Sequence, residues 1–355
     1  MKRKNNIYSK LLDFRNINKA YKNVQRNVKN KKTKLDLKQN RIFYMYRIKD
    51  VLEKREYAPQ EKRKFFVNES GKRREVYNQK PIDKIINNLV ALEILYPAII
   101  PKLIDQNVAS RPGLGTEMGL NFFYKFIMDS NRQWKNYYIL KCDIHKFFAS
   151  INHDILKKKL KKAIKDKDAL KILFTIIDSD KEGLSLGSMT SQVLAIFYLN
   201  DLDHYIKEEL KIKRYVRYQD DFLLFVKTKK EARGCLEKIK VFVEKEDLKL
   251  NKSTRIYSSR ENIKYLGKTK KGKNVKNKKI IKKYNQSLEK YRKGELSLNS
   301  VQSTLNNYVY RIGKRIFKNI SKKVSKKQKT KTNFKKLKEK KLWKEKSFYN
   351  LIYIF

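Results

Sequence analysis

Cysteine and long apolar runs are scarce in this sequence of 355 residues. Its two cysteines, Cys142 and Cys235, have no metal-binding spacing and are too few for a disulfide framework. No run of eighteen apolar residues occurs, and residues 1–10 lack the apolar core of a signal peptide. These absences predict a soluble protein of a reducing compartment that has no membrane partner.

Acidic residues are also few, because 36 Asp and Glu stand against 88 Lys and Arg and leave a net charge of +52. A folded chain with this charge would repel itself unless a polyanion neutralised it, so nucleic-acid phosphate is the expected partner. A basic protein bound to the ribosome or to a membrane surface is the alternative. Aromatic residues make up 12% of the chain, too many for a disordered basic tail, so we expect the charge on a folded body.

The first 135 residues contain the patterns of helices and of one β-hairpin. Apolar residues at helical spacing predict a helical extension over residues 1–50. Within residues 51–135, the runs KFFV and REVY flank Glu69-Ser70-Gly71 and predict a hairpin. Pro81 then begins a predicted helix over residues 82–95, since its fixed φ suits a first turn and apolar residues recur on one face.

Residues 136–267 alternate between strand and helix patterns. The run YYILKCD predicts a strand that ends in Asp143, and two helices follow, the first capped by Asn152. RYVRY and FLLFV, separated only by residues 219–221, predict a hairpin with carboxylates at its tip, and another helix follows. This order predicts an α+β fold in which helices pack on one side of an antiparallel sheet.

The composition changes after residue 267. Residues 268–355 contain 29 Lys and Arg and 4 Glu but no Asp, which gives this stretch a charge of +25. Apolar residues remain at Leu305, Tyr308, Ile312 and Ile316, so we predict a basic helical domain that grips a nucleic-acid duplex by its backbone. A solvated helical surface that binds nothing in particular is the alternative.

Three aspartates stand where predicted strands end. Asp143 closes one strand, and Asp220 and Asp221 lie on the turn of the next hairpin. Adjacent carboxylates repel each other, and a divalent metal ion would relieve that repulsion. Three carboxylates from neighbouring strands would offer the oxygen ligands that Mg²⁺ prefers. Two such ions, about 4 Å apart, would activate a 3′-hydroxyl and stabilise a leaving pyrophosphate. A merely solvated turn is the alternative.

Several segments together resemble the reverse transcriptases. YVRYQDDFLLF resembles the catalytic Y-x-D-D hairpin of that family, and LKCDIHKFFASINHDIL resembles its first metal-binding strand with the helix that follows. SRPGLGT (110–116) resembles the template-contacting segment, and LNKSTRI and IKYLG resemble the end of the palm and the primer grip. The resemblance runs from about Tyr57 to Gly267. It is greatest to the bacterial branch that contains group II intron, retron and diversity-generating retroelement enzymes.

The resemblance implies a right-hand polymerase and a set of metal ligands. Fingers would span residues 51–135, the palm with its catalytic site 136–267 and a basic helical thumb 268–355, after the extension of residues 1–50. Two Mg²⁺ ions, for which Mn²⁺ is a substitute, would be bound by Asp143, Asp220, Asp221 and the backbone carbonyl of Ile144.

The resemblance also assigns nucleotide and nucleic-acid contacts. Phe148 matches the bulky gate that clashes with a ribonucleotide 2′-hydroxyl, and Arg73 or Arg74 would hold the triphosphate, since the guanidinium fork binds phosphate bidentately. Lys252 is a candidate proton donor to pyrophosphate. The implied template and primer contacts are Arg111, Tyr218, Tyr265, Leu266 and Gly267. Alternatively, Phe148 is only a core residue, and Arg73 and Arg74 lie on a solvated strand face.

One motif departs from the pattern of many relatives. Where they carry Q-G-x-x-x-S-P, this sequence has Leu186-Gly187-Ser188-Met189-Thr190-Ser191-Gln192. This form of the motif, with an aliphatic residue before the glycine and Ser-Gln at its end, resembles diversity-generating retroelement enzymes and some phage-defence reverse transcriptases. Leu186, Gly187 and Gln192 would still adjoin the nucleotide. A glutamine at position 186 could hydrogen-bond it, whereas leucine only packs against it, so we expect low fidelity.

The expected partners are an RNA template, a DNA or RNA primer and dNTPs. The expected location is the cytoplasm of a prokaryotic cell, with the protein encoded by the cell or by a phage. A cognate structured non-coding RNA and a small accessory protein are further expectations from the resemblance. The favoured function is mutagenic cDNA synthesis of the diversity-generating type. A defence-associated enzyme that copies a non-coding RNA is the alternative, and a non-catalytic RNA-binding protein with the same fold is a remote one.

Overall fold

The computed structural model describes residues 3–69, 72–270, 286–287 and 289–296, with no side chain described from 68 to 74. The chain divides into two compact units, Met1–Leu266 and Gly267–Phe355. In the second unit the described part consists of β8 (Lys268–Thr269) and short stretches up to residue 296. The predicted basic helical thumb, with Leu305, Tyr308, Ile312 and Ile316, therefore lies largely outside the described residues.

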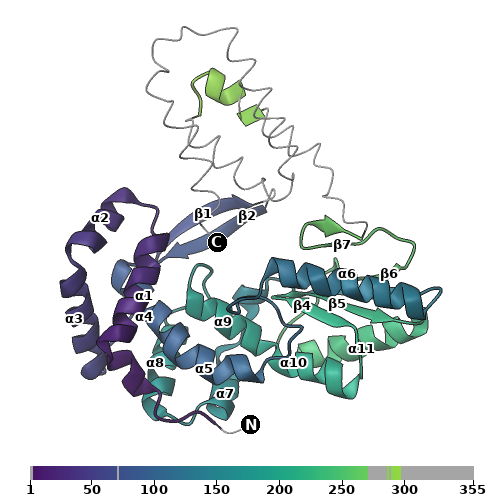
Figure 1. Ribbon diagram of the computed structural model, residues 1–355, viewed down its shortest axis with the longest axis horizontal. Helices are drawn as coiled ribbons and strands as arrows, with labels where there is room; N and C mark the ends of the chain where they lie inside the picture. The colour runs from purple at the N-terminus through teal and green to yellow at the C-terminus, as the bar shows by residue number, and fades with distance from the viewer. Residues whose placement is uncertain (1–2, 70–71, 271–285, 288, 297–355) are drawn as a thin grey trace. The chain divides into compact units, whose positions relative to one another are not determined.

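The first unit begins with helices, as the sequence predicts. They are η1 (Tyr8–Leu12), α1 (Phe14–Asn27), α2 (Lys31–Gln39) and α3 (Arg41–Glu53). Asp13 caps α1 by accepting a hydrogen bond from the Arg15 N–H, and Asn30 caps α2 in the same way from Thr33. Figure 1 shows these helices at the end of the unit opposite to its largest sheet.

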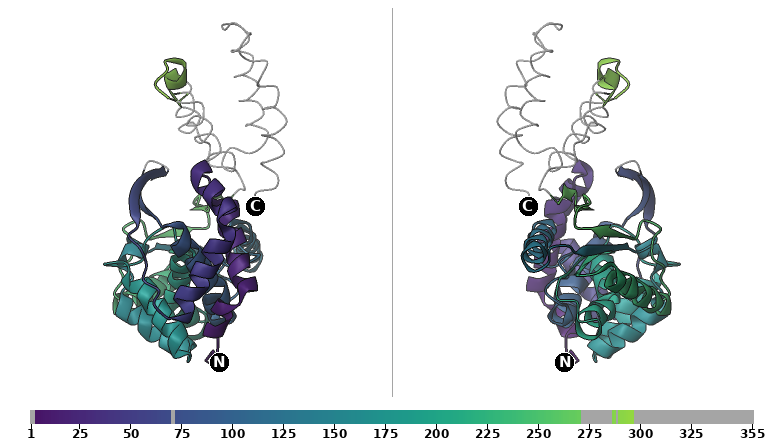
Figure 2. Two further views of the ribbon diagram at one scale, coloured as in Figure 1. Left: turned by 90° about the vertical axis from the view of Figure 1, so that its left-hand side faces the viewer. Right: turned by 90° about the vertical axis from the view of Figure 1, so that its right-hand side faces the viewer.

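The predicted hairpin forms from β1 (Arg63–Glu69) and β2 (Lys72–Asn78), which pair in antiparallel register. Figure 2 shows the hairpin standing away from the helices, and Phe65, Phe66 and Val67 are correspondingly exposed. After it comes a helical run made of α4 (Pro81–Val90), η2 (Ala91–Leu95), α5 (Tyr96–Ile99) and η3 (Ile100–Lys102).

This run, Pro81–Lys102, would be long and apolar enough to cross a membrane by length and composition alone. More than half of its most apolar window, 56%, is buried inside the unit, as in the core helix of a soluble domain. Its π-helical segment Ala91–Leu95 comes directly before Tyr96 and Pro97. Proline has no N–H to donate to the intrahelical hydrogen bond, and a widened π-helical turn accommodates this loss while the helix continues.

The central sheet has four antiparallel strands in the order β4-β5-β3-β6. The strands are β3 (Tyr138–Asp143), β4 (Tyr215–Tyr218), β5 (Asp221–Val226) and β6 (Arg255–Ser258). With the helices between them, this makes the β-α-β-β-α-β arrangement known as ferredoxin-like. The first strand of this sheet along the chain, β3, thereby becomes an inner strand next to β5.

Helices cover both faces of this sheet, which corrects the prediction that they pack on one side. On one face α6 (Thr116–Gln133) contributes Phe123, Phe126 and Ile127 to a cluster with Ile139, Val216, Leu223 and Phe225. On the other face Leu140, Cys142, Phe222 and Leu224 belong to the main core, together with α11 (Lys229–Lys245). Figure 1 shows α6 and α11 on opposite sides of β4 and β5. The continuous apolar run of β5 is typical of a strand buried on both faces.

The remaining helices lie between β3 and β4 in sequence. They are η4 (Phe147–Ser150), α7 (His153–Ala163), α8 (Lys167–Asp178), α9 (Met189–Tyr198), α10 (Asn200–His204) and η5 (Tyr205–Glu209). Asn152 caps α7 as predicted, because its side chain accepts hydrogen bonds from the N–H groups of Asp154 and Ile155. The last described element of the first unit is β7 (Lys264–Tyr265).

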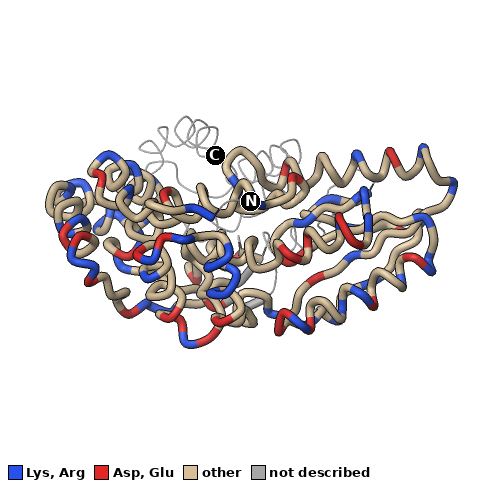
Figure 3. The backbone as a smooth tube through the Cα atoms, turned by 90° about the horizontal axis from the view of Figure 1, so that it is seen from below, with Lys and Arg blue, Asp and Glu red and all other residues tan. Residues whose placement is uncertain are grey.

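Basic residues are spread over the described chain. Figure 3 shows Lys and Arg along most helices, with Asp and Glu among them. Many of these acidic groups form exposed pairs of the kind seen between Lys54 and Asp50, at 2.7 Å along one helix. Such pairs add little stability, so the described fold depends on its apolar core and on a few buried polar contacts.

Among the described residues, the pair of Arg217 and Asp203 is buried completely. Arg217 of β4 and Asp203 of α10 have no exposed side-chain surface, and the Nε–Oδ1 and Nη2–Oδ2 distances are 2.7 and 2.5 Å. Arg217 also donates to the carbonyls of Ile196 and Gln219, at 2.9 and 3.0 Å. Asp203 accepts a further hydrogen bond from the Tyr215 hydroxyl, at 2.7 Å. The pair therefore ties β4 and the turn after it to the helices beneath.

We predict that Arg217→Met lowers the free energy of unfolding by about 3–5 kcal/mol, because it leaves the Asp203 carboxylate buried without its cation. Urea denaturation of the full chain measures this. The control is Arg55→Met, which breaks the solvent-exposed pair with Asp168 and should cost far less, because water screens that pair. Equal losses in the two variants would contradict the prediction.

Candidate active site

Strand register brings two of the three predicted carboxylates together. Asp143 ends β3 and is the direct cross-strand partner of Asp221, the first residue of β5. Asp220 precedes it on the hairpin turn, after Gln219, whose backbone has a φ of 56°. The prediction that Asp220 and Asp221 both lie on the turn is therefore wrong for Asp221, which pairs with Tyr218 and so belongs to the ladder.

Asp143 is held by the segment that follows α11. Its backbone carbonyl accepts a hydrogen bond from the Asn251 N–H at 2.7 Å, and its Oδ2 accepts one from the Ser253 hydroxyl at 3.2 Å. Next to it, Ile144 forms a bridge with Leu250 and its side chain is buried. The segment 250–253 thereby fixes the end of β3, where the carboxylate leaves the sheet.

Lys141, two residues before Asp143, forms an ion pair with one of these carboxylates, that of Asp221. Its Nζ lies 3.0 Å from Asp221 Oδ2 and donates to the Lys264 carbonyl at 3.0 Å. It also lies 5.8 Å from the centre of the Tyr265 ring. Lys141 thus connects the β4–β5 hairpin with the segment that resembles the primer grip.

The environment of Asp221 favours its neutral form. Burial raises the pKa of this carboxyl to about 6, against the lowering effect of Lys141, and the charges of Asp143 and Asp220 raise it further. Its Oδ1 is buried and accepts no hydrogen bond from the described residues. A carboxylate oxygen without a donor, next to two other carboxylates, is chemically suited to a cation.

The carboxylates fit a divalent metal ion by donor chemistry, since all three offer the hard oxygen ligands that Mg²⁺ and Mn²⁺ accept. Across the described ranges, however, no three His, Cys, Asp or Glu side chains are gathered closely enough to hold an ion. By donor chemistry, Asp143 and Asp221, with Asp220 beside them on the turn, are nevertheless the residues that would bind one, and Ile144 would contribute its carbonyl.

The predicted gate and the predicted nucleotide loop are in contact. Phe148, in η4, is half-buried, and its carbonyl accepts a hydrogen bond from the Leu184 N–H at 2.7 Å. Gly183 has a φ of 61°, and a Cβ there would lie 2.4 Å from the same Phe148 carbonyl oxygen. Only glycine fits this approach of two backbones.

Leu186 and Gly187 lie against β2, the second strand of the β1–β2 hairpin. The Leu186 carbonyl accepts a hydrogen bond from the Tyr77 N–H at 3.1 Å. Gly187 has a φ of 114°, and a Cβ there would lie 2.8 Å from the Tyr77 carbonyl oxygen. Gln192 is exposed on α9, and Lys252 is exposed in the turn before β6.

Arg73 and Arg74 lie on β2, where their Cα partners are Asn68 and Val67. Their side chains are outside the described part, so the assignment to the triphosphate stays a prediction. The backbone places both residues near the tip of the hairpin, away from Tyr77, which contacts the nucleotide loop.

The predicted template and primer residues differ in their surroundings. Arg111 is half-buried, and its Nη1 donates to the carbonyls of Ile104 and Asn107 at 2.7 and 2.9 Å, so part of its guanidinium serves the fold. Burial lowers the pKa of Arg111. Tyr218 ends β4 and is half-buried.

Tyr265 and Leu266 are held by α6. Tyr265 is fully buried, its ring centre lies 5.5 Å from that of Phe123, and burial raises the pKa of its hydroxyl. Leu266 packs against Gly119, where a Cβ would come within 2.7 Å of its side chain. Gly267 begins the second unit with a φ of 79°.

Several residues that shape this site could not be identified from the sequence patterns. Lys141 and Ser253 act through contacts between segments far apart in the chain, and Arg217 and Asp203 through a contact between a strand and a helix. Lysine and arginine are so frequent here that no single one of them is distinctive. The one available signal was the position of Lys141 on the same strand as Asp143, two residues earlier and therefore on the same face.

Carboxylates from adjacent strands at the end of a ferredoxin-like sheet are suited to metal-assisted transfer of phosphoryl groups. A family model described as reverse transcriptase (RNA-dependent DNA polymerase) matches residues 60–269, more than half of the chain. The chain therefore belongs to the reverse transcriptase family, and it is an RNA-directed DNA polymerase. Enzymes of this family use divalent metal ions, a template, a primer and nucleotide substrates. A search of curated proteins found no match.

The raised pKa of Asp221 predicts a pH-dependent stability for the metal-free protein. Between the ordinary value of 3.8 and about 6, the folded state holds a proton that the unfolded state has lost, so stability falls as the pH rises through this window. Asp221→Asn should remove this loss. Relative to the wild type, the variant should gain roughly 2–3 kcal/mol between pH 4 and pH 7. Urea denaturation with a chelator at several pH values measures the difference, and a constant difference would contradict it.

Lys141→Met should shift this window upward. Lys141 lowers the pKa of Asp221, so its removal lets that pKa rise above about 6, and the loss of stability should continue to higher pH. The same denaturation series measures the shift. Lys264→Met is the matched control, because its side chain is exposed and the variant keeps the backbone carbonyl that Lys141 contacts. A window that ends at the same pH in both variants would contradict this assignment.

Proposed function

We propose that this reverse transcriptase makes cDNA from an RNA template by two-metal nucleotidyl transfer and that it is a low-fidelity enzyme of the diversity-generating type. The observation that carries the proposal is the register of the sheet, which pairs Asp143 with Asp221 and puts Asp220 on the adjoining turn. The family match over residues 60–269 supports the general activity.

In this mechanism Asp143, Asp220 and the Ile144 carbonyl would bind the metal ions, and Asp221 would assist. The ions would supply charge that favours ionisation of the primer 3′-hydroxyl and stabilises the leaving pyrophosphate. Asp221 stays in place through its ladder pairing and through Lys141. Phe148 would exclude ribonucleotides, and Arg73 or Arg74 would bind the triphosphate.

The decisive test is primer extension on an RNA template with purified full-length protein and Mg²⁺ or Mn²⁺. Asp220→Asn should reduce the rate at least about 10²–10³-fold, as expected for the loss of one group that stabilises transition-state charge. Asp154→Asn is the control, because Asp154 is exposed on α7 and should leave the rate unchanged. Equal rates in the two variants would reject these carboxylates as catalytic and would favour the non-catalytic RNA-binding alternative.

Leu186 supports the proposal of low fidelity, because a leucine offers the nucleotide no directional hydrogen bond. Leu186→Gln should lower the misincorporation frequency by about tenfold, as expected when a site gains one discriminating contact. Sequencing of all products from one template measures this. The proposal of low fidelity fails if the two error frequencies are equal while the rates of synthesis are comparable.

The defence-associated alternative is favoured by the same motif, since its aliphatic G-x-x-x-S-Q form occurs in both types. The error spectrum distinguishes them. Errors concentrated at one template base support the diversity-generating type, whereas uniform accuracy on a cognate non-coding RNA supports the defence type. The cognate RNA and a small accessory protein remain proposals that belong to one or the other type.

A further inference from the structure

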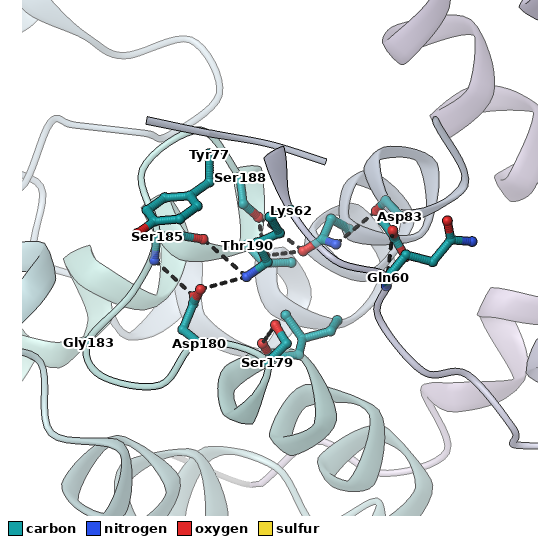
Figure 4. Close-up of polar contacts among 12 residues, drawn as sticks. Gln60, Lys62, Tyr77, Asp83, Ser179, Asp180, Gly183, Ser185, Ser188 and Thr190 are labelled. Atoms are coloured by element: carbon teal, nitrogen blue, oxygen red, sulfur yellow. Dashed lines mark hydrogen bonds and ion pairs between the residues drawn. The ribbon is translucent and has the colours of Figure 1, made fainter. Parts of the chain in front are cut away.

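An almost buried ion pair joins the base of the β1–β2 hairpin to the loop after α8. Lys62 directly precedes β1, and Asp180 follows α8 by two residues. The Lys62 Nζ lies 2.6 Å from Asp180 Oδ1, and the two side chains are only 10% and 12% exposed. Figure 4 shows the pair between the hairpin and the loop. In a chain whose described ion pairs are mostly exposed, this burial needs a reason.

The pair is attached directly to the loop that carries Leu186. Lys62 Nζ also contacts the Ser185 hydroxyl at 3.2 Å, and the Ser185 N–H donates to Asp180 Oδ2 at 2.9 Å. Both oxygens of Asp180 are thus in use, one on the lysine and one on the backbone beside Leu186. We refer to Lys62, Asp180 and Ser185 as the clamp (Figure 4).

The rest of the loop is held from the other sides. Leu184 donates to the carbonyl of Phe148, the predicted gate, and Leu186 accepts from Tyr77 on the hairpin. At the far end, the Ser188 and Thr190 hydroxyls contact Asn87 Oδ1, at 3.0 and 2.5 Å, on α4. Residues 184–187 form no helix or strand, so these contacts decide where Leu186 lies.

The other attachments do not replace the clamp. Tyr77 and Phe148 bind the loop through single backbone hydrogen bonds, and Asn87 binds only its end. Among the contacts of the described residues, the clamp is the one that holds Ser185, next to Leu186, through the side chains of Lys62 and Asp180. Buried charged pairs add little net stability but can define one arrangement of the groups around them. The clamp therefore suits a positional role better than a stabilising one.

We propose that Lys62 and Asp180 are positioning residues for nucleotide selection, which hold Leu186 against the hairpin and the Phe148 gate. This rests on the proposed function, in which Leu186 adjoins the incoming nucleotide. Neither side chain touches the substrate; both act through Ser185. The hairpin, the gate and the nucleotide loop then form one fixed surface, and release of the clamp separates them.

The test is single-nucleotide insertion by the full-length enzyme, with kcat and KM measured for correct and incorrect dNTPs. Lys62→Met should raise the KM for the correct dNTP about tenfold with kcat within about twofold, since the loss is one of position. The ratio of incorrect to correct insertion should change with it. Lys62→Arg should restore most of the effect, and Ser185→Ala, which keeps the ion pair, should give a smaller change in the same direction.

The matched control is Lys157→Met. Lys157 pairs with Asp178 at 2.5 Å, close to the clamp in sequence, but its contacts do not reach residues 184–187. This variant should leave KM and insertion ratio unchanged. Equal effects of Lys62→Met and Lys157→Met, or a fall in kcat alone, would reduce the clamp to a structural contact and overturn the proposal.

Hydrogen exchange separates the clamp from the proposed function. The Ser185 N–H is bound by Asp180, so a peptide over residues 181–190 should exchange at least about tenfold faster in Lys62→Met than in Lys157→Met. Unchanged exchange would overturn the clamp whether or not the enzyme polymerises. Faster exchange with a changed KM, but no response to Leu186→Gln, would support the clamp and reject Leu186 as the discriminating contact.

Discussion

Arg217 and Asp203 carry the charges on which the position of Asp220 and Asp221 depends. The guanidinium reaches the Gln219 carbonyl inside the hairpin turn, so the pair sets the conformation of the residue directly before Asp220. The strand β4 cannot shift without separating two charges where no water can replace either partner. The strand register then sets the position of the carboxylates, because Asp221 is fixed opposite Asp143 once β4 and β5 are in place.

Local pattern was sufficient for much of the fold. Turn residues between β-rich runs predicted the β1–β2 hairpin and the β4–β5 hairpin. Asn152 was predicted as a helix cap because its side chain can accept hydrogen bonds from the first turn of the helix. These features depend on neighbours within a few residues. Coverage of the sheet on both faces was missed, although the unbroken apolar run of β5 indicated it, because strand order β4-β5-β3-β6 is a long-range property.

The supporting contacts of the site could not be predicted, for a different reason. Lys62 and Asp180 are 118 residues apart, and Lys141 meets a carbonyl 123 residues away. A chain with 88 Lys and Arg offers many equivalent candidates for each contact. Carboxylates were easier to identify, since they are rarer and stand at strand ends. Charge composition thus made the three candidate aspartates easy to identify and hid the residues that position them.

Gly183 lies where the nucleotide loop touches the segment around Phe148, so the amino-acid sequences of these two segments constrain each other. Its backbone touches that of Phe148 and Ala149 so closely that no side chain fits between them. Substitutions near the gate and in the nucleotide loop should therefore be epistatic, each tolerated only against a matching background in the other. Under the roles proposed for Phe148 and Leu186, sugar selection and base selection would then be inherited together. A library that aims to alter one of them has to vary residues 146–150 and 183–187 at the same time.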